Sequence, residues 1–170
     1  METPTPGQFN DSLAVVPMAD LPLPGANAFV AAVDPDFYGS DGGTALTSSL
    51  ITRRYMVIAS DMGAGKESSW RTRIMAGKFE ARYTRKEILG LYLNSADYGR
   101  GAVGLVAAAR TYFHKPAARL TVAEAAWLAV QLDPDRPTPK AGWERVLGTM
   151  VDRGWLSPAE REKLTFPAGL

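Results

Sequence analysis

The side chains best suited to chemistry in this sequence are basic, and they gather between positions 53 and 86. Nine Lys and Arg residues stand there against three acidic ones, Asp61, Glu67 and Glu80. The whole chain carries a net charge of only +1, which argues against nucleic-acid binding. Guanidinium and ammonium groups can hold an anion such as a phosphate. A local excess of charge is also typical of a solvated helix face, and the charge count alone favours that second interpretation.

Other reactive side chains are few. The chain has no cysteine, which excludes disulfides and thiolate metal sites, and we predict no metal site from the sequence. His114 is the only histidine, and we interpret it as a surface loop residue. We interpret the four tryptophans as core or rim aromatics. No signal-peptide pattern opens the chain, and no apolar run approaches the roughly 20 residues of a membrane span.

The elements that must position these groups are helices. Three capping boxes, in which a Ser or Thr precedes a Glu by three positions, predict helix starts at Thr84, Thr121 and Ser157. The segment 102–113 is almost entirely small or apolar, and predicts a helix buried between others. Apolar residues from Trp143 onward recur at helical spacing and predict an amphipathic helix.

Further helices are predicted upstream. Residues 26–33 form a short apolar helix that stops before Pro35, after an extended lead-in broken by prolines. Two more helices are expected at 44–54 and 70–80. The sequence thus predicts an all-α fold of seven to nine helices, with little or no sheet. Residues 1–12 form a flexible tail and residues 13–170 a single domain. The expected core includes Leu93, Val106, Ala109, Tyr112, Leu120, Leu128 and Leu147.

Four strings, in the order ILGLYLN, YGRGAVG, AAARTYFHK and LTVAEAAWLA, run almost without interruption from residue 88 to residue 129. They resemble the signature of the peptidoglycan glycosyltransferases, the transglycosylase domain of class A penicillin-binding proteins and monofunctional transglycosylases. The resemblance extends over roughly residues 15 to 166. It implies a lysozyme-like helical fold with a smaller jaw lobe near the membrane, and a role in cell-wall biosynthesis.

The resemblance also implies which residues form the site. A cleft is expected between the Val33–Tyr38 turn and the helices at 44–54 and 70–80. The matching or neighbouring positions expected to bind substrate are Gly43, Thr44, Thr47, Arg53, Arg54, Arg71, Arg73 and Glu80. The two glutamates on which the family's mechanism depends fall on Val33 and Thr72.

Two functional hypotheses follow from these replacements. In the first, the domain binds lipid II and the growing glycan strand without efficient turnover, because Val33 cannot accept a proton. In the second, it is a diverged but active transglycosylase in which Asp34 replaces the general base. Asp34 can equally serve as a cap for a helix end or for local backbone, and we favour that role. The charged residues at 53–86 could bind a diphosphate under either hypothesis.

The resemblance has further implications for cofactors, partners and location. No cofactor is required by the sequence, although the family can use a divalent cation. The expected partners are lipid II, the nascent glycan strand, the membrane surface and other cell-wall synthesis proteins. The expected location is the cell envelope, at the outer face of the cytoplasmic membrane.

Overall fold

The computed structural model describes residues 23–39, 48–63, 65–133, 135 and 137–168. Within them the chain forms eight α-helices and one 3-10 turn, and no strand. The helices are α1 (Leu23–Val33), α2 (Leu50–Ala59), α3 (Trp70–Glu80), α4 (Arg85–Ser95), α5 (Leu105–Phe113), α6 (Val122–Gln131), α7 (Pro139–Asp152) and α8 (Pro158–Glu162), with the 3-10 turn η1 at Ala117–Arg119. The predicted all-α class is confirmed. The predicted tail, residues 1–12, lies outside the described residues.

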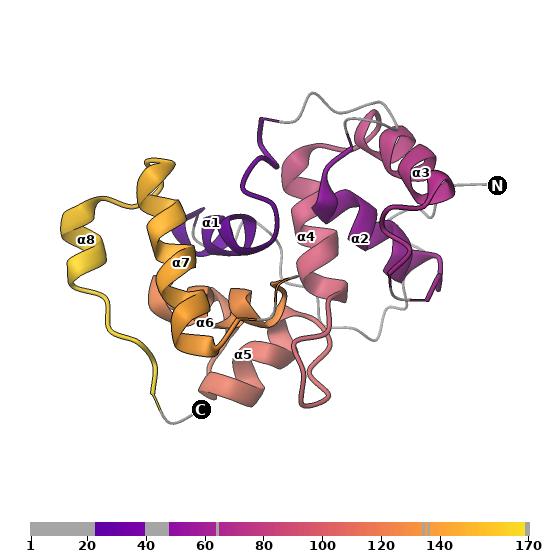
Figure 1. Ribbon diagram of the computed structural model, residues 1–170. Helices are drawn as coiled ribbons and strands as arrows, with labels where there is room; N and C mark the ends of the chain where they lie inside the picture. Colours follow the sequence, from indigo (N-terminus) through magenta and orange to yellow (C-terminus); the bar gives the residue numbers. More distant parts are fainter. Residues whose placement is uncertain (1–22, 40–47, 64, 134, 136, 169–170) are drawn as a thin grey trace.

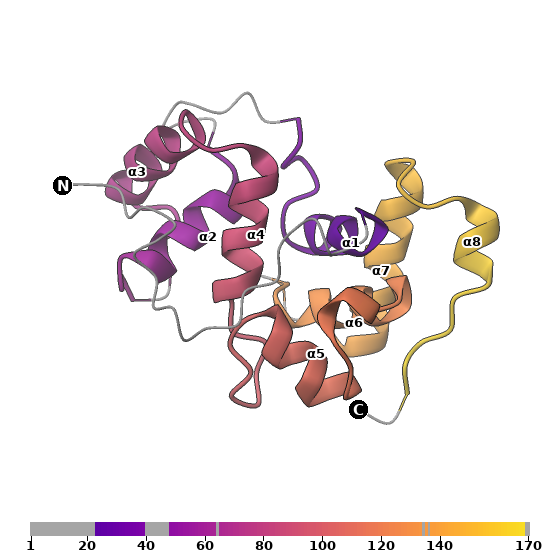
Figure 2. The ribbon, with the colours of Figure 1, turned by 180° about the vertical axis from the view of Figure 1, so that it is seen from behind.

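The helices form two groups that lie side by side (Figures 1 and 2). Helix α2 packs on α3 and on α4 in the first group, and α1, α6 and α7 pack on one another in the second. Helix α5 contacts α4 and so links the groups along the chain. The turn after α1 and the N-terminus of α2 meet between the groups, because Leu50 N donates a hydrogen bond to Asp34.

All three predicted capping boxes are present. Thr84, Thr121 and Ser157 each accept a hydrogen bond from the backbone N–H three residues on, and the Glu at that position accepts one in return. Each box satisfies two N–H groups that a helix start would otherwise leave without a partner. Helices α2 and α3 use simpler caps, in which Ser49 and Ser69 accept from the N–H of Thr52 and Thr72.

Three predicted helices have other bounds in the structure. The helix expected at 44–54 begins at Leu50 and runs to Ala59, and residues 48 and 49 are not helical. Two other boundaries are wrong by three residues. The helix expected at 102–113 begins at Leu105, because residues 97 to 103 form a tight turn closed by a hydrogen bond from Tyr98 N to Ala102 O. Gly104 then adopts φ +85°, and a Cβ there would lie 2.7 Å from the Asn94 carbonyl oxygen, so only glycine fits. Helix α1 begins at Leu23 and not at residue 26, since proline is tolerated in a first helical turn.

The core is continuous through both groups, with Phe29, Tyr98 and Trp143 among its largest fully buried side chains. Six of the seven predicted core residues are buried: Leu93, Ala109, Tyr112, Leu120, Leu128 and Leu147. The seventh, Val106, is only partly buried against the core, on the outer side of α5. The prediction for the tryptophans is wrong at Trp70, which is 69% exposed at the start of α3.

Candidate functional site

Two carboxylates hold the N-terminus of α2. Asp34, directly after α1, accepts a hydrogen bond from Leu50 N at 2.7 Å. Glu80, the last residue of α3, accepts from Ser49 N at 2.9 Å and from the hydroxyl of Thr52. Negative groups are favourable at a helix N-terminus, where free N–H groups and the helix dipole point outward. The ends of α1, α2 and α3 therefore meet at one point.

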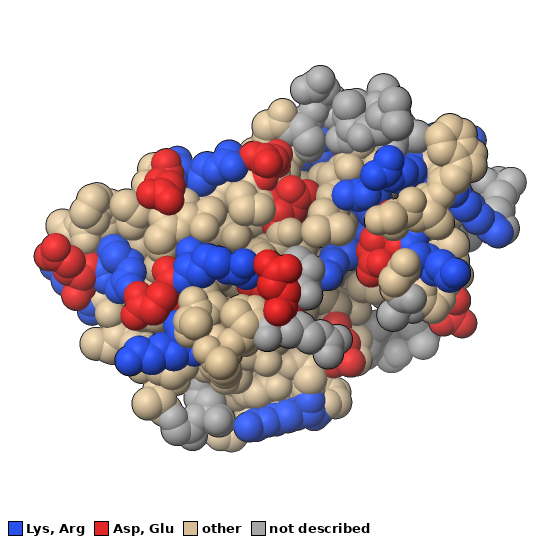
Figure 3. Space-filling model, in the orientation of Figure 1, with Lys and Arg blue, Asp and Glu red and all other residues tan. Residues whose placement is uncertain are grey.

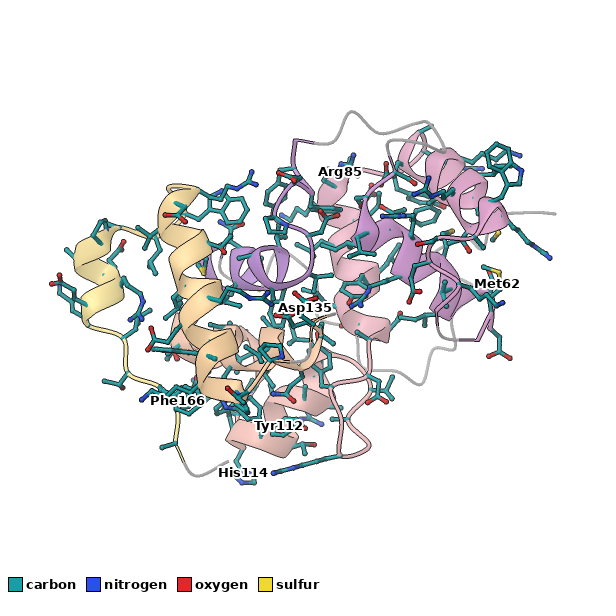
Figure 4. The ribbon with its side chains drawn as sticks, viewed as in Figure 1. Met62, Arg85, Tyr112, His114, Asp135 and Phe166 are labelled. Atoms are coloured by element: carbon teal, nitrogen blue, oxygen red, sulfur yellow. The ribbon has the colours of Figure 1, made fainter. Side chains whose placement is uncertain are left out.

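Glu80 is also half of a buried ion pair. Its side chain is 1% exposed, and its Oε1 lies 2.8 Å from the guanidinium of Arg85, at the start of α4. The same guanidinium lies over the ring of Phe37, with 5.1 Å between the Arg85 Cζ and the ring centroid. Arg85, labelled in Figure 4, thus connects α3, α4 and the turn that follows α1.

Burial raises the pKa of Asp34 above its ordinary value of 3.8, and the backbone hydrogen bonds from Leu50, Ile51 and Asp36 oppose this rise. The carboxylate is therefore partly removed from water and already engaged by backbone donors. The sequence allows Asp34 to be either a helix cap or a general base, and the structure shows the capping interaction.

Arg53 and Arg73 form a pair of like charges beside these carboxylates. Burial, and then the positive charge of Arg73, lower the pKa of Arg53, while Asp34 and Glu80 oppose the shift. The Nε of Arg53 donates to Ser49 O at 3.4 Å, whereas the buried Nε of Arg73 has no hydrogen-bond partner among the described residues. Two guanidiniums whose charges influence one another in this way could together hold a multiply charged anion. Figure 3 shows several Lys and Arg side chains over this part of the molecule, at the upper right.

The other two predicted arginines point elsewhere. Arg54 turns to the opposite side of α2, where it donates to the Leu132 carbonyl oxygen at 2.7 Å and lies 3.5 Å from the Tyr92 hydroxyl. Leu132 caps the C-terminus of α6, where a positive charge is favourable. Arg71 is exposed on α3. A step of one residue along a helix turns the side chain by about 100°, which separates Arg53 from Arg54.

Val33 and Thr72, to which the family resemblance assigns the two glutamate positions, are both buried. Val33 is 4% exposed at the end of α1, and Thr72 is 0% exposed in the first turn of α3. The Thr72 hydroxyl donates to the Lys66 carbonyl oxygen at 2.8 Å and lies 2.7 Å from the Ser69 hydroxyl. Thr72 therefore takes part in closing the loop before α3.

Three predicted substrate-binding residues, Gly43, Thr44 and Thr47, lie outside the described residues, as does the rest of the segment 40–47. Among the residues that the structure does describe, no three Asp, Glu or His side chains converge as a metal site.

Sequence reasoning missed the tie between Ser49, Thr52 and Glu80. Ser49 followed three residues later by a helical Thr is a recognisable N-cap pattern, but nothing local indicates that a glutamate 31 residues on completes it. The role of Arg85 was also missed. It follows the capping Thr84 and reads in sequence as one more exposed cation.

The all-helical fold, the ordered motifs of α4 to α6 and the basic cluster at α2 define a transglycosylase-type domain. Residues 27–150 match the family model described as transglycosylase, and the chain belongs to that family. More closely, it carries a transglycosylase domain of the class A penicillin-binding protein and monofunctional transglycosylase group, as the relatives below indicate.

Two kinds of relative are similar to the chain. Penicillin-binding protein 1A of Mycobacterium tuberculosis is 34% identical over 149 residues, and that of Mycolicibacterium smegmatis is 32% identical over 182 residues. These alignments cover 82% and 89% of this chain, but 18% and 23% of the relatives. The biosynthetic peptidoglycan transglycosylase of Klebsiella oxytoca is 55% identical over 53 residues, which cover 31% of this chain and 22% of that protein. The chain thus spans about a fifth of the length of these relatives.

None of the described helices is both long enough and apolar enough to cross a membrane.

Proposed function

We propose that this domain binds a diphosphate-linked glycan precursor of the lipid II class, and the growing glycan strand, without polymerising them efficiently. The proposal rests on the like charges of Arg53 and Arg73, which influence one another. It rests also on the buried, non-acidic Val33 and Thr72, which the resemblance assigns to the glutamate positions. A lipid-linked diphosphate carries its charge on oxygens that suit bidentate guanidinium contacts. Chemistry, by contrast, needs a base that reaches the attacking hydroxyl, and Val33 supplies none.

The residues of the site would divide this work as follows. Arg53 and Arg73 hold the diphosphate, and the end of the Arg71 side chain, exposed on the same helix as Arg73, adds positive charge. Glu80 and Asp34 fix the start of α2 and thereby position Arg53. Gly43, Thr44 and Thr47 contribute to substrate binding in this proposal, on the strength of the family motif alone.

A membrane surface and other cell-wall synthesis proteins are the proposed partners, at the outer face of the cytoplasmic membrane. The exposed Trp70, with Ile58 at 42% exposure, lies in a part of the chain that is rich in Lys and Arg. Aromatic and basic side chains together suit a lipid headgroup region. This arrangement supports contact between the α2–α3 end of the domain and the membrane.

One observation favours the alternative of an active enzyme. Burial raises the pKa of Asp34, and this is the direction of shift that makes a carboxylate a better proton acceptor. Against it, the Asp34 Oδ2 already accepts a hydrogen bond from Leu50 N. Polymerisation of lipid II that disappears in Asp34→Asn, while lipid II binding persists, would establish the active enzyme in place of the binding domain.

The binding test compares lipid II in detergent micelles with undecaprenyl monophosphate. Arg53→Gln combined with Arg73→Gln should weaken lipid II binding by at least about tenfold at low salt, where charge effects are largest. Arg82→Gln with Lys78→Gln is the matched control, since both side chains are exposed cations of the same segment. Equal loss from both pairs would mean that the charge acts only as a diffuse field, and no loss from either would refute the proposal.

A further inference from the structure

A cavity of about 620 Å³ opens on the side of α2 that Arg54 faces, away from Arg53. Its walls come from α2, from the loop between α2 and α3, from the end of α4 and from the end of α6. Met62, labelled in Figure 4, stands on that loop. Small-molecule sites commonly measure about 300 to 1,000 Å³ and combine an apolar wall with a few polar groups.

The polar groups of this cavity are of both signs. The guanidinium of Arg54 has only neutral hydrogen-bond partners among the described contacts, and its buried Nε has none. The carboxylates of Asp61, Glu67 and Asp97 line the same space. A fourth carboxylate, that of Asp133, is already engaged by an ion pair with an arginine of α7.

The charges of Arg54 and of Glu67 both act on the hydroxyl of Tyr92, and all three residues line the cavity. Burial raises the pKa of Tyr92, the charge and hydrogen bond of Arg54 lower it, and the charge of Glu67 raises it. No ion pair joins Arg54 to Glu67 among the described residues, so each retains capacity for a charged partner. The apolar part of the wall is formed by Val57, Ile58, Met62, Ala96 and Leu132, and Gln131 and two glycines complete the lining.

We propose that this cavity binds a short zwitterionic peptide of small aliphatic residues. Its carboxylate would pair with Arg54, its amino group with the carboxylates led by Glu67, and its side chains would lie on the apolar wall. A carboxylate takes two parallel hydrogen bonds from a guanidinium, which would satisfy the free Nε. Neither Arg53 nor Arg73 is among the described residues that line this cavity, and the proposal does not depend on the proposed function.

The first experiment measures binding of alanyl-alanine to the unaltered protein, by calorimetry and by NMR chemical shifts. The N-acetylated and the C-amidated dipeptides are the matched controls, since each lacks one charge. Both should bind at least about tenfold more weakly than the free dipeptide. No binding of the free dipeptide at about 10 mM, or equal binding of either blocked form, would overturn the proposal.

The second experiment locates the site. Arg54→Gln and Glu67→Gln should each weaken binding of the free dipeptide by about tenfold or more, while Arg82→Gln, a change of an exposed cation, should leave it unchanged. Glu67→Gln changes a loop residue, so it remains informative if Arg54→Gln fails to fold. Binding that survives Glu67→Gln, or that falls only with Arg82→Gln, would place the dipeptide elsewhere and refute this assignment.

Discussion

Replacing Glu80 by Ala should cost the domain about 3 kcal/mol of unfolding free energy. The change removes an ion pair with Arg85 whose carboxylate is 1% exposed, and breaking a buried pair typically costs about 3–5 kcal/mol. The lower end applies because the Arg85 side chain remains 21% exposed, so water can solvate part of the charge left behind. The acceptor for Ser49 N and for the Thr52 hydroxyl is lost at the same time.

Urea unfolding followed by circular dichroism at neutral pH measures this loss. Glu124→Ala is the matched control. Glu124 also forms an ion pair, with Lys115 at 2.7 Å, and completes a capping box, but its side chain is 16% exposed. A partly exposed pair of this kind contributes about 1 kcal/mol. If Glu80→Ala lowers the unfolding free energy by no more than Glu124→Ala, the contacts of Glu80 that join α2, α3 and α4 do not stabilise the site.

Three further outcomes are expected. Because burial raises the folded-state pKa of Asp34, its stabilising contribution is present below pH 3.8 and lost as the pH rises through the raised value. Asp34→Asn should therefore gain stability relative to the unaltered protein above about pH 4, and parallel urea midpoints across pH 3.5 to 7 would contradict this. Val33→Glu with Thr72→Glu should cost about 3 kcal/mol or more for each buried acid and restore no glycan synthesis, so a folded, polymerising variant in a glycan-chain assay would overturn the closed-site interpretation. Gly104→Ala should lower the unfolding free energy by about 2–3 kcal/mol in urea titrations, and clearly more than Gly101→Ala, which has positive φ but open space around it. Equal losses from the two glycine variants would show that the close backbone contact has no cost.

Much of the helical frame could be predicted from the sequence, because its signals are local. A capping box such as Thr84 with Glu87 acts within one helical turn, so its residues specify the helix start before any tertiary contact forms. The core positions of α6 and α7 follow from helical spacing in the same way. Boundaries were missed at residues 23 and 105, where a proline and a glycine turn allow more than one start.

The resemblance of the sequence to the family predicts that Val33 and Thr72 stand at the two glutamate positions. The tertiary structure decided how those positions are used. It turned Val33 and Thr72 inward and placed Asp34 on the backbone of α2. It also separated Arg53 from Arg54, although they are adjacent in sequence.

Only the fold could decide these points, because each depends on groups far apart in the chain. Glu80 meets Ser49 across 31 residues, and Arg54 meets Leu132 across 78. Neither the hydrophobic periodicity nor the composition of the sequence indicates such long-range contacts. It results from the packing of whole helices, whose buried apolar faces fix the directions in which the remaining charged side chains point.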